Sequence, residues 1–300
     1  MNKLRSQGTA IFMALLIVAI VTSITVFIMR SQQIDIHRTE MMLTSDQAYL
    51  YTQGVIGWAK GAIQVNVQQR TPTHAAPSWP LILPPTAIAN GEGTIAGSLQ
   101  DAEGLINLNN FAATLPTTNS TNNPLPGNDT ATVLLKLLTI LHMPVSQAQG
   151  QQLIQAITAW VSNPAKPGAT YTDSYDAQYR QAIPPYQSPH AFMVSASELR
   201  MVSGITPQLY NALLPYITAL PDQTSLNHQH APLPIQQALG QQSSQGSQPT
   251  QSTNHYFLLR TDVYLRDQHL IVYTLLQTLG GSKPGQPPLI TTLWQSFGTV

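Results

Sequence analysis

Cysteine is absent from the 300 residues of the chain, and charged residues are scarce. Without cysteine the chain has no disulfides, no thiolate zinc site and no cysteine nucleophile. Only 9% of the residues are charged, against about 25% in ordinary proteins, and the formal net charge is zero. Because nothing in this balance would hold a nucleic-acid backbone, we expect no nucleic-acid partner.

Recognisable catalytic motifs are also missing. The chain contains no GxSxG, HExxH, P-loop or dinucleotide-binding motif, and no spacing of serine, histidine and aspartate indicates a catalytic triad. His228 and His230 form a His-x-His pair, but the sequence suggests no third metal ligand. We therefore expect that the protein is not an enzyme.

Long hydrophobic runs are limited to one, from Thr9 to Met29, which carries no charge. At about 1.5 Å per residue a helix of this length covers roughly 30 Å, the hydrocarbon thickness of a bilayer. The run is longer than the apolar core of a removable signal and lacks small residues at its C-terminal border, which favours a permanent single-pass anchor. Lys3 and Arg5 before it predict a cytoplasmic N-terminus and an exported, periplasmic remainder.

A small residue precedes the apolar run, at Gly8. A cut between Gly8 and Thr9 would remove a short basic leader, residues 1–8, and leave the hydrophobic helix as the new N-terminus. We accordingly predict a leader at 1–8 and a transmembrane segment at 9–30.

The helical pattern continues past the membrane to about residue 69, because proline is absent and apolar residues recur every three or four positions. This stripe should pack on a sheet. Gly54, Gly57 and Gly61 lower helix propensity and, on one face, would allow another element to approach closely.

The remaining chain predicts strands before and after a helical block. Residues 71–93 appear as an irregular connection, 94–100 and 105–109 as short strands, and 112–128 as a linker. Helices are expected between 129 and 240, interrupted by a tyrosine-rich loop at 166–193. A period of two returns from residue 256. The expected fold is α+β, with a long N-terminal helix on an antiparallel sheet. Residues 31–111 and 250–300 would form this domain, with 112–249 as a large helical insertion.

Several of these segments resemble the K-type minor pseudopilin family of type II secretion systems. The glycine-terminated basic leader before an apolar helix looks like a prepilin peptidase signal. The further matching segments are R-T-E-x-x-x-x-S-D-Q-A-x-x-Y from Arg38 to Tyr51, LINLNNF at 105–111, PPY at 184–186 and SELRMVSGITPQLYNALLPYITALP at 197–221.

The resemblance implies a pilin-like fold and a place at the tip of a periplasmic pseudopilus, where the subunit nucleates and caps assembly for protein export. It implies I- and J-type minor pseudopilins, the major pseudopilin, prepilin peptidase and the inner-membrane secretion platform as partners. It also implies methylation of Thr9 after cleavage. Met13 would be the fifth mature residue, where most pilins carry a glutamate that the K type lacks.

Members of this family resemble one another in an acid-rich loop that binds calcium, and this chain departs from that pattern. Only Asp173 and Asp176 remain as calcium candidates, whereas calcium takes six to eight oxygen ligands. No cofactor other than calcium is expected.

The alternatives to this family are a type IV pilus minor pilin and, from a different class, a membrane-anchored periplasmic hydrolase whose helical insertion acts as a lid. A membrane-tethered DNA receptor is disfavoured by the charge count.

Overall fold

The computed structural model describes residues 3–68, 79–88, 91, 93–113, 126–162, 173–240, 254–266, 268–279 and 288–298. The helices are α1 (Lys3–Gln68), α2 (Pro126–Ile140), α3 (Gln147–Val161), α4 (Asp173–Arg180), α5 (Pro207–Leu213) and α6 (Leu233–Leu239), with short 3-10 helices η1 (Ala102–Gly104), η2 (Leu108–Ala113), η3 (Ala196–Met201) and η4 (Leu214–Tyr216). The strands are β1 (Leu81–Ala87), β2 (Gly93–Asp101), β3 (Ile106–Asn107), β4 (Ile217–Thr218), β5 (Asn254–Leu265), β6 (Gln268–Leu279) and β7 (Leu289–Phe297).

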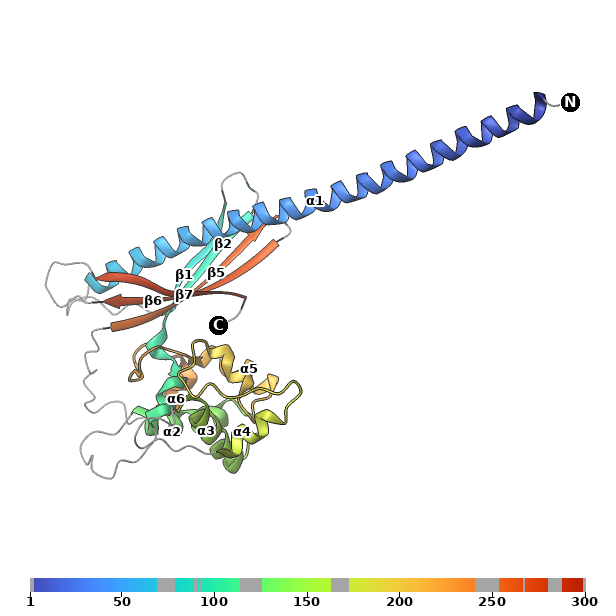
Figure 1. Ribbon diagram of the computed structural model, residues 1–300. Helices are drawn as coiled ribbons and strands as arrows, with labels where there is room; N and C mark the ends of the chain where they lie inside the picture. Colours follow the sequence, from blue (N-terminus) through green and yellow to red (C-terminus); the bar gives the residue numbers. More distant parts are fainter. Residues whose placement is uncertain are drawn as a thin grey trace.

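Helix α1 is the longest element, with 66 residues, or roughly 100 Å at about 1.5 Å per residue. Its N-terminal part projects away from the rest of the molecule (Figure 1). Three hydroxyl groups in this part donate to the carbonyl four residues earlier, Thr22 at 2.6 Å, Ser23 at 2.8 Å and Thr25 at 2.8 Å. These bonds satisfy the hydroxyls within the helix, which makes them tolerable in lipid.

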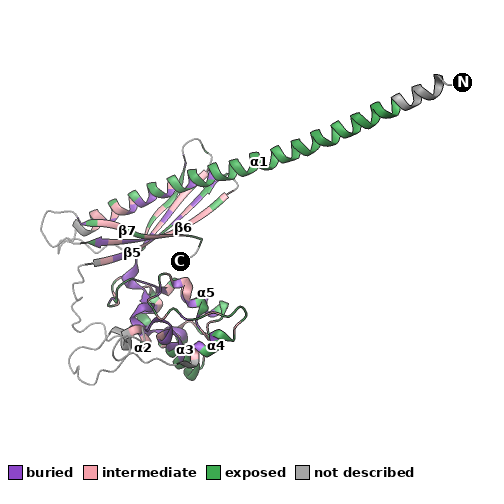
Figure 2. Ribbon diagram, viewed as in Figure 1, coloured by how far each residue is buried: buried purple, intermediate pink, exposed green. Residues whose placement is uncertain are grey.

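The main sheet has five antiparallel strands in the order β1-β2-β5-β6-β7. The C-terminal half of α1 lies along one face of it, and burial along the helix begins there, as Figure 2 shows. Val55, Ala59 and Ile63 of α1 pack against Leu99 of β2 and Leu259 of β5 in one apolar cluster. The predicted α+β fold, with a long helix on an antiparallel sheet, is therefore confirmed.

A second core lies in the helical part of the chain, on the other side of the sheet from α1 (Figure 1). Trp160 of α3 is buried there and meets the ring of Tyr179 edge-on, with 5.3 Å between centroids. Local signals set the helix starts, because Ser146 forms a capping box with Gln149 at the start of α3 and Thr206 caps α5.

The helical part packs against the sheet at the end where β2 stops and β5 starts. Strands β2 and β5 are neighbours in the sheet, although the whole helical part lies between them in sequence. Ala102 and Leu220 pack there against Tyr256 of β5 and Leu275 of β6. The helical part thus enters and leaves through one end of a continuous sheet.

Three details differ from the sequence-based expectations. The segment 71–93 contains strand β1. Within the described residues β1 is an edge strand that pairs with β2 alone, and such a strand tolerates Pro84 and Pro85 at a register shift. The expected strand at 105–109 is reduced to β3, which pairs in parallel with β4 outside the main sheet. The tyrosine-rich loop between α3 and residue 192 includes helix α4.

No element of the described chain approaches the α1 glycines closely. A Cβ atom built at Gly54, Gly57 or Gly61 would meet nothing within 4 Å. These glycines lie on the exposed side of α1, and the sheet packs on the opposite side. The close approach expected at these glycines stays a prediction that the described residues do not test.

Candidate functional site

The membrane-spanning part of α1 is the first candidate site. Its described side chains are all exposed from Ile11 to Leu43, and Met13 is 66% exposed. By length and composition α1 is the one described helix that can cross a membrane. The predicted leader residues Lys3, Arg5 and Gly8, and Thr9 after them, lie in the helical backbone of α1, but their side chains are outside the described set. The cleavage site stays a prediction.

Exposed apolar side chains continue on α1 beyond the predicted span. Ile34, Met42 and Leu50 are each more than half exposed, and burial along the helix begins only at Thr44. Exposed apolar side chains of this kind on a single helix are costly in water and indicate packing against other helices.

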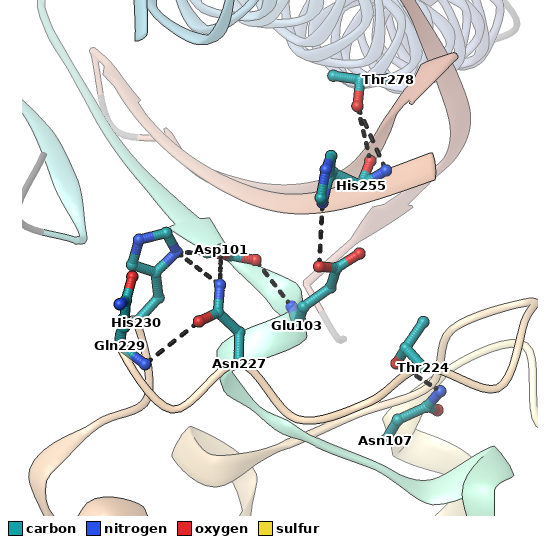
Figure 3. Close-up of polar contacts among 9 residues, drawn as sticks. All are labelled: Asp101, Glu103, Asn107, Thr224, Asn227, Gln229, His230, His255 and Thr278. Atoms are coloured by element: carbon teal, nitrogen blue, oxygen red, sulfur yellow. Dashed lines mark hydrogen bonds and ion pairs between the residues drawn. The ribbon is translucent and has the colours of Figure 1, made fainter. Parts of the chain in front are cut away.

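A polar network joins the sheet to the helical part and is the second candidate (Figure 3). The Asp101 carboxylate, at the end of β2, makes a short contact with Nδ1 of His230 and accepts from Asn227 Nδ2 at 3.1 Å. Glu103 Oε2 lies 3.1 Å from Nδ1 of His255 on β5. Two acids of one short turn are thus each paired with a histidine from a distant segment.

This network fixes geometry and offers no open reaction site. Asp101, Glu103 and His230 are buried, and a Cβ on Gly104 would lie 2.6 Å from the backbone oxygen of His230. The Oε1 atom of Glu103 is buried without a hydrogen-bond partner. The loop carrying His230 is therefore held tightly against η1.

Three asparagines, Asn107 at the end of β3 and Asn109 and Asn110 after it, hold the helical part together from inside. Asn109 is fully buried, and its Nδ2 donates to the carbonyls of Met193 at 2.9 Å and Leu220 at 2.7 Å. Asn107 accepts from the backbone N–H of Leu220 at 3.1 Å, and Asn110 Nδ2 donates to the Thr224 carbonyl at 2.8 Å. The sequence predicts a short strand at 105–109, and the long-range partners of these asparagines have no local signal in it.

Aspartate, histidine and serine do meet at one place, between α4 and the following loop. Asp176 Oδ1 accepts from Ser188 Oγ at 2.7 Å, and Asp176 Oδ2 lies 2.9 Å from His190 Nε2. Ser188 Oγ also lies 2.9 Å from the same nitrogen, whereas His190 Nδ1 faces the Ala159 carbonyl at 3.1 Å. In a catalytic triad the acid and the serine contact opposite ring nitrogens, so this cluster is not wired for nucleophilic attack.

The same contacts bear on calcium. Both carboxylate oxygens of Asp176 are engaged by Ser188 and His190, and an imidazole is not among the oxygen ligands calcium prefers. The described residues contain no group of three or more acids and histidines that could hold a metal ion. The side chain of Asp173 lies outside the described set. The described residues therefore do not fit a calcium site.

Tyr256 lies at the junction between the sheet and the helical part, and its pKa is raised there. Its hydroxyl donates to Asp222 Oδ2 at 2.6 Å, and burial, followed by this hydrogen bond to an acceptor, raises the pKa of Tyr256 above its ordinary value. An unfolded tyrosine loses its proton near pH 10, whereas the folded one keeps it. The resulting stability is present below pH 10 and is lost as pH rises through the folded pKa.

We expect the free energy of unfolding to fall more steeply above pH 10 in the wild type than in Tyr256→Phe. Urea unfolding at pH 8 and pH 11, followed by circular dichroism of the full chain in detergent, would measure the difference. Tyr264→Phe removes an exposed hydroxyl and is the control. An identical pH dependence in wild type and Tyr256→Phe would contradict the assignment.

Comparison with known proteins points to one family. Residues 104–222 match the family model described as Type II secretion system (T2SS), protein K. The type II secretion system protein K of Aeromonas hydrophila is 27% identical over 248 residues, which cover 80% of this chain and 71% of that protein. The Pseudomonas aeruginosa protein of the same name is 26% identical over 239 residues, which cover 78% of this chain and 68% of that protein.

A solved structure has the same fold. It is described as the crystal structure of the GspK-GspI-GspJ complex from the enterotoxigenic Escherichia coli type 2 secretion system. One chain of it matches with a TM-score of 0.62 at 21% identity, over 88% of this chain and 100% of that one. The long helix, the antiparallel sheet and these matches agree, and the chain is similar in sequence and in fold to the type II secretion system protein K family.

Proposed function

We propose that this minor pseudopilin sits at the tip of the type II secretion pseudopilus, where it nucleates and caps assembly for protein export. The observation that carries the proposal is the apolar surface of α1, whose side chains are all exposed from Ile11 to Leu43. Such a surface suits a helix that leaves lipid to pack among neighbouring helices. The role is structural, in keeping with a pseudopilin family.

The position at the tip is supported by Met13. In most pilin-type subunits a glutamate at the fifth mature position can meet the terminal amine of a neighbour, and a carboxylate in lipid is costly without such a partner. Met13 is apolar, and it would stand at that position after a cut at Gly8. A subunit at the tip has no neighbour above it whose terminal amine could meet the glutamate, so methionine in place of glutamate removes no contact.

The single apolar N-terminal helix and the family make the chain a membrane-anchored, single-pass protein. We further assign the N-terminus to the cytoplasm, because Lys3 and Arg5 precede the span, and the bulk of the chain to the periplasm. In this orientation prepilin peptidase would cut at Gly8 on the inner face of the bacterial inner membrane. The inner-membrane platform and the major pseudopilin would then receive the mature helix.

We divide the chain into a leader (1–8), a transmembrane segment (9–30), a pilin-like domain and a helical insertion. The adjacency of β2 and β5 in one sheet supports an insertion between them. Ile106, Leu108 and Phe111 pack into the core of the helical part. The insertion is therefore better started near Gly104 than at residue 112, and its end near residue 249 falls outside the described residues.

We propose I- and J-type minor pseudopilins as direct partners, since the matching solved chain comes from a GspK-GspI-GspJ complex. The full chain, extracted from membranes in detergent, should co-purify with both in equal amounts. As a control, residues 1–30 fused to an unrelated periplasmic domain should retain neither, because the span alone lacks the head. Failure of the full chain to retain either protein would contradict the proposed assembly.

A further inference from the structure

The two outer strands of the main sheet differ in how they are protected. An exposed strand edge presents unpaired N–H and C=O groups, and proteins usually blunt it with proline, charge or a bulge. Strand β1 follows this rule, because Pro84 and Pro85 lie in it and its register shifts between Leu83 and Thr86. Its edge is a poor template for another strand.

Strand β7 carries much less protection. Its nine residues, LITTLWQSF, include no proline and no charge. One irregularity in its pairing lies opposite Leu275 and Leu276, and the four residues from Leu289 to Thr292 run in regular register before it. Within the described part of the chain, β7 pairs with β6 alone. The outer edge is thus a strand without proline or charge, with one irregularity, and without a second pairing partner in those residues.

The side chains of β7 are apolar where they are most exposed. Leu289 is 62% exposed and Phe297 is 56% exposed. The Phe297 ring lies 6.3 Å from that of Tyr49 on α1, which is itself 40% exposed. The C-terminal end of β7 therefore lies beside a partly exposed part of α1 that follows the Ile11–Leu43 surface we assign to packing between subunits.

We propose that the free edge of β7 pairs with an extended strand from a neighbouring minor pseudopilin head. Backbone groups in a row are satisfied by the backbone of another extended chain, and exposed leucine and phenylalanine side chains favour apolar residues at alternate positions of that strand. This inference rests on the proposed function, since the neighbour is a subunit of the same assembly. It adds a specific contact in the head to the packing of the membrane helices.

Amide hydrogen exchange of the full chain in detergent tests the pairing. On addition of the I- and J-type proteins, the amides of Leu289–Phe297 that point away from β6 should exchange at least about tenfold more slowly. The amides of β1 should change little. Unchanged exchange in β7 within a complex that forms would overturn the pairing while leaving the proposed function intact.

Paired substitutions supply a second measure. Leu289→Lys with Leu293→Lys should weaken retention of the partner at least about tenfold, because lysines on an edge oppose strand addition. Ile82→Lys with Thr86→Lys places the same charges on exposed positions of β1 and should leave retention unchanged. Circular dichroism melting of each variant would verify folding. Equal retention by both variants would overturn the inference.

Two further outcomes separate the possibilities. If wild-type chain retains neither partner, the proposed function fails, and the pairing fails with it. If β7 becomes protected without partners and in proportion to the concentration of this chain, a second copy occupies the edge, which overturns the assignment to a neighbouring pseudopilin.

Discussion

Asn109→Asp is expected to destabilise the helical part by at least about 3 kcal/mol, because buried charges facing acceptors are among the most costly substitutions. The native amide nitrogen donates to the carbonyls of Met193 and Leu220, and its oxygen accepts from the Met193 N–H at 2.8 Å. A carboxylate would keep the last bond and turn its second oxygen towards two carbonyl oxygens. Protonation would relieve only part of this conflict.

Urea unfolding of the full chain in detergent, followed by tryptophan fluorescence, would measure the effect, since Trp160 lies in the core of the helical part. Gln237→Glu makes the same amide-to-acid change on an exposed position of α6 and should shift stability by less than about 0.5 kcal/mol. If Asn109→Asp unfolded at the same urea concentration as Gln237→Glu, the asparagine contacts would not be structural supports.

The second large effect is expected for removal of the leader, because each molecule either keeps residues 1–8 or loses all of them. Intact mass of the membrane-extracted protein should correspond to a chain beginning at Thr9, with or without one methyl group. Gly8→Val should yield the full chain from Met1, since a branched side chain replaces the small residue at the cut. Ser6→Val changes the leader without touching the cut and should be processed normally.

A wild-type protein that retains Met1 would contradict the leader assignment. It would also remove the argument from Met13, because the fifth mature position is defined only by the cut. Membrane anchoring would remain, since the apolar run from Thr9 to Met29 does not depend on processing.

Elements with strong local signals could be predicted from the sequence. The apolar run and the absence of proline predict α1, and Ser146, Thr206 and Pro207 mark helix starts that the structure contains. The alternating pattern after residue 256 predicts β5 and β6. In each case neighbouring residues carry the information, because a helix or hairpin depends on contacts only a few positions apart.

Elements without such signals could not be predicted. Strand β1 contains two prolines and exists because β2 offers it an edge, so the sheet overrides a local preference. Helix α4 lies in a loop-like composition and is held from outside, where Tyr175 donates to the Gln152 carbonyl at 3.3 Å. Such elements depend on partners that local pattern does not identify.

The sequence by itself determined the apolar run of α1, the charge class and those strands and helices that have strong local signals, because hydrophobicity and period act locally. Only the tertiary structure decided which polar groups meet at the junction, where Asp101 and His230 are 129 residues apart and Glu103 and His255 are 152 apart. It also decided that Asp176 pairs with His190 and that β7, within the described residues, pairs with β6 alone. A polar group that is buried without a hydrogen bond loses stabilisation, and the tertiary structure alone determines which partner lies close enough to bond to it.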